Sequence, residues 1–67
     1  MTVFINKKET QLADKTDIPA MLQLSGIENI KGIAIAINNE VIPKNNWSDY
    51  LLKDQDKITI ITATAGG

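Results

Sequence analysis

The residues best suited to chemistry are Gly66 and Gly67, which end a small-residue tail with the sequence Ala-Thr-Ala-Gly-Gly at 63–67. Glycine has no Cβ, so a diglycine lets the walls of another protein approach its main chain closely. If extended, such a tail reaches roughly 17 Å, enough to enter a deep active site while a globular domain stays outside. We therefore interpret the Gly67 carboxylate as the reacting group of a flexible tail. Thr64, Ala65 and Gly66 would be thin enough to thread into a narrow slot.

The alternative is that Gly-Gly is a frayed end or the remnant of a linker, because such residues accumulate at chain termini. Two features favour a functional tail. The small residues follow a strong strand pattern without a Ser- or Pro-rich spacer, and the sequence stops at the second glycine. We expect a linker to continue further.

Length and composition predict a single folded domain over residues 1–67. The chain is 43% hydrophobic and 22% charged, as in ordinary folded domains. Its net charge is −1, and seven scattered lysines without arginine form no basic stripe, which argues against nucleic acid as a partner. No apolar run approaches the roughly 20 residues needed to span a bilayer. We expect a cytoplasmic protein that does not enter a membrane.

The missing residue types narrow the chemistry further. The sequence has no cysteine and no histidine, which excludes thiol nucleophiles, disulfides, the usual zinc sites and histidine-based acid–base catalysis. A chain of this size also has little volume for a cleft that would shift carboxylate pKa values. We predict no metal, no bound cofactor and no catalytic residues of its own, so the chemistry is expected on partner proteins.

The elements that position the tail begin with a hairpin and a helix. Alternating apolar residues predict a strand over 2–6, and a tight turn leads to a short return strand over 9–12. Asp17 is placed to cap a helix that carries Pro19 in its first turn and ends at Gly26. The apolar stripe of this helix consists of Ile18, Met21, Leu22 and Ser25.

The second half of the chain predicts three more strands. Isoleucine and alanine alternate over 32–37, and Asn38-Asn39 suits a two-residue hairpin turn before a short strand over 40–42 that Pro43 ends. A crossover with a helical turn follows over 44–52, where we expect Trp47, Leu51 and Leu52 to pack over the core edge. A polar turn at 54–56 precedes the last strand, 57–63, which runs into the tail.

The order strand, strand, helix, strand, strand, strand predicts an α+β fold of the β-grasp type. A mixed sheet of four to five strands would wrap around the one helix, with the first and last strands parallel. The expected core members on the helix side are Val3, Ile5, Ile33, Ile35, Ile37, Ile58 and Ile60. Phe4, Ala34, Ala36 and Ile61 would share the uncovered face. That face is either a partner-docking surface or ordinary scattered apolar surface, and the residues support both interpretations.

These features together resemble the ThiS family, the sulfur carriers of thiamin thiazole synthesis, within the ubiquitin-like β-grasp proteins. The resemblance covers essentially the whole chain. It depends on the short first hairpin, the Ala-Ile-Asn-Asn run at 36–39, the Val-Ile-Pro-Lys-Asn-Asn-Trp segment at 41–47, and the Asp-x-Asp-x-Ile motif at 54–58 ahead of Ala-Gly-Gly at 65–67. Two positions depart from the family pattern. Gln55 replaces a common glycine, which predicts a local difference in that turn, and Lys44 replaces a frequent arginine.

The resemblance implies a sulfur-carrier function centred on Gly67. An E1-like adenylyltransferase of the ThiF type would use ATP and magnesium to join AMP to the Gly67 carboxylate. Sulfur from a donor such as a cysteine desulfurase would then displace AMP and leave a thiocarboxylate. A thiazole synthase of the ThiG type would accept the tail and take up the sulfur.

Three alternatives stay open at this stage. The small subunit of molybdopterin synthase has the same fold and the same diglycine thiocarboxylate, although its chains tend to be longer. A ubiquitin-like modifier would instead join Gly67 to lysines of other proteins. A non-covalent interaction module would carry an inert tail.

Overall fold

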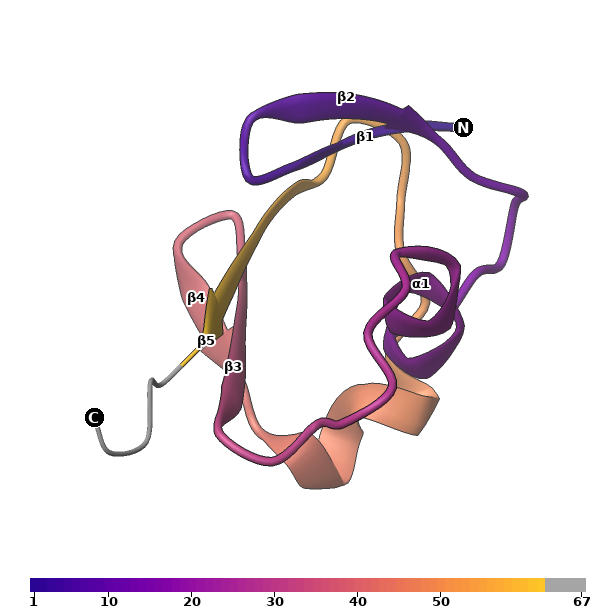
Figure 1. Ribbon diagram of the computed structural model, residues 1–67. Helices are drawn as coiled ribbons and strands as arrows, with labels where there is room; N and C mark the ends of the chain where they lie inside the picture. The colour runs from indigo at the N-terminus through magenta and orange to yellow at the C-terminus, as the bar shows by residue number, and fades with distance from the viewer. Residues whose placement is uncertain (63–67) are drawn as a thin grey trace.

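The chain folds as one mixed sheet around one helix (Figure 1). The computed structural model describes residues 1–62, and the tail at 63–67 lies outside the described residues. In chain order the elements are β1 (Thr2–Ile5), β2 (Lys8–Gln11), α1 (Ile18–Leu24), β3 (Ile33–Ile37), β4 (Glu40–Ile42), the 3-10 helix η1 (Lys44–Asp49) and β5 (Lys57–Thr62). The sheet order is β2-β1-β5-β3-β4, with β1 and β5 parallel and the other neighbours antiparallel. The predicted β-grasp arrangement is therefore confirmed.

Two tight turns close the β1–β2 and β3–β4 hairpins, and both use asparagine at a left-handed backbone position. Asn6 and Lys7 have φ values of 49° and 71°, and Asn38 and Asn39 have 53° and 71°. Positive φ at both central residues matches the right-handed twist of the flanking strands, and asparagine tolerates it better than most residues. The turn predictions are confirmed. β1 is one residue shorter than predicted because Asn6 is already the first turn residue.

Helix α1 begins where the sequence predicted. The Asp17 side chain accepts a hydrogen bond from the Ala20 N–H at 2.8 Å, and Gly26 at φ +80° follows the last turn. The helix ends at Leu24, so Ser25 is the C-cap. Ser25 is exposed and not part of the buried stripe, contrary to the prediction, because a seven-residue helix is too short to carry a fourth inward position.

The core lies between α1 and the sheet. Its central members come from α1 and from alternate positions of three strands: Ile18, Met21, Leu22, Val3, Ile33, Ile35, Ile37 and Ile58. Ile5 and Ile60, which we expected there, are partly buried and pack against its margin. Leu12, Ile42, Trp47 and Leu52 also belong to the core. Ile42 is the inward residue of β4, opposite Ile35. The other three lie outside the strands, where no single periodic pattern marks the inward side.

The crossover between β4 and β5 is anchored by Trp47. Its indole Nε1–H donates to the Ile42 carbonyl at 2.8 Å, and the side chain is 4% exposed. The expectation of a structural anchor in a helical turn is confirmed. Leu52 is buried, whereas Leu51 is 49% exposed, so the prediction for Leu51 was wrong. Leu52 N–H donates to the Thr16 carbonyl at 2.9 Å, and this contact turns alternate side chains of the segment outward.

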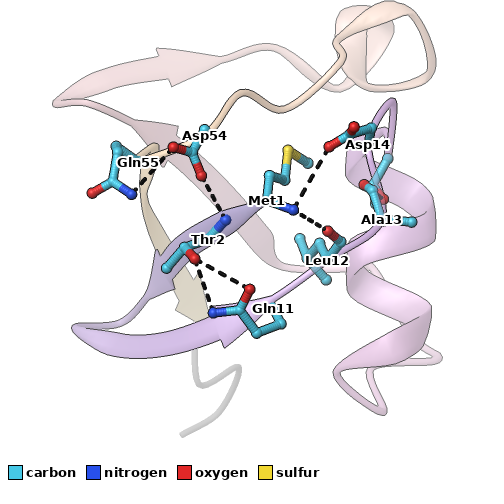
Figure 2. A network of polar contacts seen from close by, with 9 residues as sticks. Met1, Thr2, Gln11, Leu12, Ala13, Asp14, Asp54 and Gln55 are labelled. Carbon is cyan, nitrogen blue, oxygen red and sulfur yellow. Dashed lines mark hydrogen bonds and ion pairs between the residues drawn. The ribbon is translucent and has the colours of Figure 1, made fainter.

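The start of the chain is tied to the segment that follows β2 (Figure 2). The Met1 ammonium donates to the Leu12 carbonyl at 2.7 Å and lies 3.6 Å from the Asp14 carboxylate. The side chains of Thr2 and Gln11, which are opposite each other across β1 and β2, also share hydrogen bonds of 2.9 and 3.1 Å. These contacts hold β1 in place beside the strand that leads to the tail.

The turn before β5 is bound to the same strand. Thr2 N–H donates to Asp54 Oδ1 at 2.7 Å, and Gln55 N–H donates to the Thr2 carbonyl at 2.6 Å (Figure 2). Gln55 takes φ 73°, the conformation that a glycine would supply. The predicted local difference at Gln55 is therefore absent from the backbone, because the contacts to Thr2 and Asp54 hold this residue in the left-handed region.

Candidate functional site

The strand that leads to the diglycine is held on both sides. The whole of β3 pairs with β5, from Ile37 opposite Ile58 to Ile33 opposite Thr62. On the other side, Asn6 N–H donates to the Ile58 carbonyl at 2.8 Å. The predicted functional residues Thr64, Ala65, Gly66 and Gly67 lie outside the described residues. The structure thus defines the support from which the tail starts.

The Asn6 side chain extends this support by one further hydrogen bond. Its Oδ1 accepts from the Ile60 N–H at 2.8 Å and so replaces a backbone acceptor where β1 has already ended. An asparagine at the first turn position can satisfy both requirements, since it tolerates positive φ and carries a side-chain carbonyl. Sequence analysis identified Asn6 as a turn residue only and missed this contact to β5.

A second asparagine fixes the beginning of β5. Asn38 Nδ2–H donates to the Asp56 carboxylate at 3.0 Å, and Lys57 N–H donates to Asn38 Oδ1 at 3.0 Å. Asp56 is only 6% exposed and also accepts from Lys53 N–H at 2.8 Å. A buried carboxylate is costly unless hydrogen-bonded, and here neutral donors satisfy it. The β3–β4 turn and the start of β5 consequently form one unit.

The apolar open face, on the side of the sheet away from α1, contains the four residues that we predicted for it. Ala34 is opposite Ile61, Ala36 is opposite Thr59, and Phe4 is in register with Lys57. Ala34 and Ile61 are exposed, whereas Phe4 and Ala36 are partly buried. Their placement on one face is confirmed, and the docking of a partner there stays a prediction.

Val41 is a member of this face that sequence analysis missed. It is opposite Ala36 in the β3–β4 pair and is 68% exposed. The signal was present in the sequence, because Val41 directly precedes the buried Ile42 and successive strand residues point to opposite faces. From here on, the apolar open face means Phe4, Ala34, Ala36, Val41 and Ile61.

A shallow depression of about 610 Å³ lies beside this face, between the two hairpin turns. It is lined by Phe4, Asn6, Lys7, Asn39, Lys57, Ile58 and Thr59. Phe4 supplies apolar surface, and the ammonium groups of Lys7 and Lys57 give the rim positive charge. Such a depression favours a partner segment that combines apolar and acidic side chains.

The perturbed ionisable groups of the described domain serve structure. The backbone N–H of Thr2, with a smaller contribution from the Gln55 side chain, lowers the pKa of Asp54 below its ordinary value of 3.8. Burial, followed by the nearby charges of Asp56 and Glu40, raises the pKa of Tyr50. Within residues 1–62, no cluster of three His, Cys, Asp or Glu side chains could hold a metal ion. None of the helices in that range is long and apolar enough to cross a membrane.

The fold and this site define a class of protein. A five-stranded mixed sheet around one helix, with the last strand parallel to the first, is a ubiquitin-like β-grasp domain. The model of the ThiS family matches residues 2–67. The chain belongs to the ThiS family.

Individual relatives agree with this assignment. The chain is 27% identical over 67 residues to the sulfur carrier protein ThiS of Escherichia coli, and the match covers both chains completely. It is 28% identical over 67 residues to the thiazole synthase of Paramagnetospirillum magneticum, covering all of this chain and 20% of that protein.

Solved structures share the fold. The crystal structure of the thiamine biosynthesis protein ThiS from Geobacter metallireducens matches with a TM-score of 0.85 at 19% identity, covering both chains completely. The solution structure of a thiamine biosynthesis protein from the same organism matches with a TM-score of 0.80 at 19% identity, covering all of this chain and 88% of that one.

Proposed function

We propose that this chain is a cytoplasmic sulfur carrier of thiamin biosynthesis that holds the sulfur as a thiocarboxylate on Gly67. The observation that carries the proposal is the match of residues 2–67 to the ThiS family, together with a diglycine that follows β5 in the sequence after Ala63, Thr64 and Ala65. The chain would act as a protein co-substrate, and partner enzymes would supply the catalytic groups.

The chemistry begins with the Gly67 carboxylate, which resists nucleophilic attack because its leaving group would be oxide. An E1-like adenylyltransferase would remove this obstacle with ATP and magnesium: a carboxylate oxygen attacks the α-phosphorus, and pyrophosphate leaves. The resulting acyl adenylate has AMP as a stable leaving group. The terminal sulfur of a persulfide on a donor such as a cysteine desulfurase then attacks the carbonyl carbon, and AMP leaves. A thiol reductant cleaves the S–S bond of the resulting acyl disulfide, forms a disulfide with the donor sulfur, and so releases the thiocarboxylate.

The chain's own residues would present Gly67 to the partner enzymes and would not react with its activated carbonyl group. The sequence contains no cysteine that could attack the activated carbonyl. β5 is fixed by β3 along its length and by Asn6 at Ile58 and Ile60, so the tail starts from a defined position. A defined starting point lowers the entropy cost of placing Gly67 in an active site.

Thiazole synthase is the proposed acceptor of the sulfur. The thiazole synthase of P. magneticum contains a stretch that aligns with this entire chain and makes up 20% of its length. A carrier-like segment within a synthase supports the idea that the two functions work in contact. We expect this chain to approach a ThiG-type synthase with its apolar open face, tail first.

The test is thiocarboxylate formation on defined variants. The native chain is incubated with the adenylyltransferase, ATP, magnesium and a sulfur donor, and the intact mass is measured. We expect replacement of one oxygen by sulfur on the last residue. Deletion of Gly67 removes the reacting carbon, and Gly66→Val places a β-branched side chain in the tail, so both variants should fail to load.

Folding controls make this result specific. Both changes lie outside the described fold, so circular dichroism and thermal unfolding should match those of the native chain. Normal sulfur loading of either variant, or a native chain that never gains sulfur, would refute the proposed function.

A further inference from the structure

β5 extends further than the strand that pairs with its first half. β1 pairs with β5 only at Phe4 with Lys57 and at Ile5 with Ile58, whereas β3 remains paired as far as Thr62. After Ile5 the chain turns away into the β1–β2 hairpin. Figure 1 shows the lower half of β5 running beyond β1, with β3 alongside. Within residues 1–62, one edge of β5 is therefore uncovered over the last residues of the strand.

The hydrogen bonds show which backbone groups face this open edge. The Ile58 carbonyl accepts from Asn6 N–H, and Ile60 N–H donates to Asn6 Oδ1. The backbone N–H and C=O groups of the even-numbered β5 residues therefore point toward β1. By the alternation of a strand, the Ile60 carbonyl and both backbone groups of Thr62 point the same way. Within residues 1–62 none of these three groups has a backbone partner. Unpaired groups on a strand edge are a template for another strand.

We propose that this open edge, formed by the Ile60 carbonyl and the Thr62 N–H and carbonyl, pairs with an extended backbone segment of the enzyme that receives the tail. The inference rests on the proposed function, because it requires residues 63–67 to enter an active site. Pairing would begin at the Ile60 carbonyl, ahead of the tail at 63–67. It would keep the main chain extended where the tail enters the active site. Backbone pairing is independent of side-chain identity, so one edge can serve two enzymes in succession.

Three observations favour a partner enzyme over a second copy of this chain. The edge borders Ile61, which is 51% exposed and belongs to the apolar open face, so a docked protein would cover both together. The edge also lies where the chain continues toward Gly67. Finally, the Asn6 carboxamide already occupies the Ile60 N–H, which shortens the edge available to another copy. Only a protein that also contacts the open face would gain enough surface to use so short an edge.

The experiment replaces one backbone amide by an ester in the chemically synthesised full chain. An ester at Thr62 removes the N–H without changing the side chain. The matched control is an ester at Glu9: Leu12 N–H pairs with the Met1 carbonyl, so alternation directs the Glu9 N–H away from β1 at the outer edge of β2. Neither N–H is bonded within residues 1–62, so both esters should fold like the native chain.

Affinity for the adenylyltransferase and for thiazole synthase is measured without ATP. Loss of one interface hydrogen bond should weaken binding of the Thr62 ester to at least one of them by about threefold to tenfold, with the Glu9 ester unchanged. Amide exchange supplies a second readout: Thr62 N–H should gain protection in the native complex, and Glu9 N–H should not.

Equal affinities of the Thr62 ester, the Glu9 ester and the native chain for both enzymes would overturn the proposal. So would equal weakening by both esters, or self-association of the free chain that the Thr62 ester abolishes. Sulfur loading of the native chain is scored separately. If the native chain gains sulfur normally and the Thr62 ester binds both enzymes normally, pairing at the open edge is refuted and the proposed carrier function stands.

Discussion

At the scale of single residues, three polar side chains hold the strand that leads to the tail. Asn6 supplies an acceptor to Ile60, and Asn38 joins the β3–β4 turn to the buried Asp56. Each asparagine side chain supplies the hydrogen-bond acceptor for a β5 N–H at a place where the neighbouring strand has ended. Because these contacts lie at both ends of the β1–β5 pairing, they set how β5 is aligned in the sheet.

We expect Asp54 to make the stability of the fold depend on pH. Its folded pKa lies below 3.8 because the carboxylate accepts the Thr2 N–H, so its contribution is present above the unfolded pKa. That contribution is lost as pH falls through the folded pKa, where the carboxylate becomes protonated in both states. We expect the unfolding free energy, measured by urea denaturation between pH 6 and pH 2, to fall less steeply in Asp54→Asn than in the native chain. Identical slopes would contradict this assignment.

At the scale of elements, β5 depends on the turn that precedes it. Gln55 stands at φ 73°, and its N–H donates to the Thr2 carbonyl at 2.6 Å. The turn thus connects the ends of two parallel strands that are far apart in the sequence. Gln55 adopts the unfavourable left-handed conformation because the hydrogen bonds of this turn require it.

Gln55→Gly should stabilise the domain. Glycine removes the left-handed strain and partly offsets this gain by greater freedom in the unfolded chain, so we expect a net increase of about 0.5–1 kcal/mol in unfolding free energy. Thermal and urea unfolding measure it. The matched control is Lys53→Gly in the same turn, where φ is not positive and glycine should only destabilise. A Gln55→Gly chain no more stable than the native one would show that the position is unstrained.

At the scale of the whole molecule, the two faces of the sheet have different tasks. One face is covered by α1 and holds the core, and the other presents the apolar open face next to the strand that carries the tail. An uncovered sheet face with exposed aliphatic side chains is a natural contact surface. We therefore expect the same five strands to serve stability on one side and recognition on the other.

A charge on the open face should separate docking from folding. Ile61→Asp places a carboxylate at a position that is 51% exposed, and we expect its affinity for thiazole synthase to fall by about tenfold or more. Leu24→Asp is the control, since Leu24 is 71% exposed on α1, across the core from this face, and should bind like the native chain. Titration calorimetry with both variants decides. Equal affinities would remove the apolar open face from the interface.

Much of the fold was predictable because local rules and global topology agree. Asp17 has the chemistry of an N-cap, the alternation over 33–37 marks a strand with one buried side, and Asn38-Asn39 is a hairpin signal. Predictions failed where a side chain's direction depends on distant contacts. Leu51 and Leu52 are equally apolar, and only the bond from Leu52 N–H to Thr16 determines which of them points inward.

The order of the elements can be read from the sequence alone. The diglycine at 66–67, in a chain with neither cysteine nor histidine, also predicts a reacting carboxylate whose catalytic groups come from other proteins. The support of β5 becomes visible only in three dimensions. The parallel pairing of β1 with β5 and the hydrogen bond from the Ile60 N–H to Asn6 Oδ1 join residues more than fifty positions apart. Such contacts follow from packing in three dimensions, which no local pattern of residues encodes.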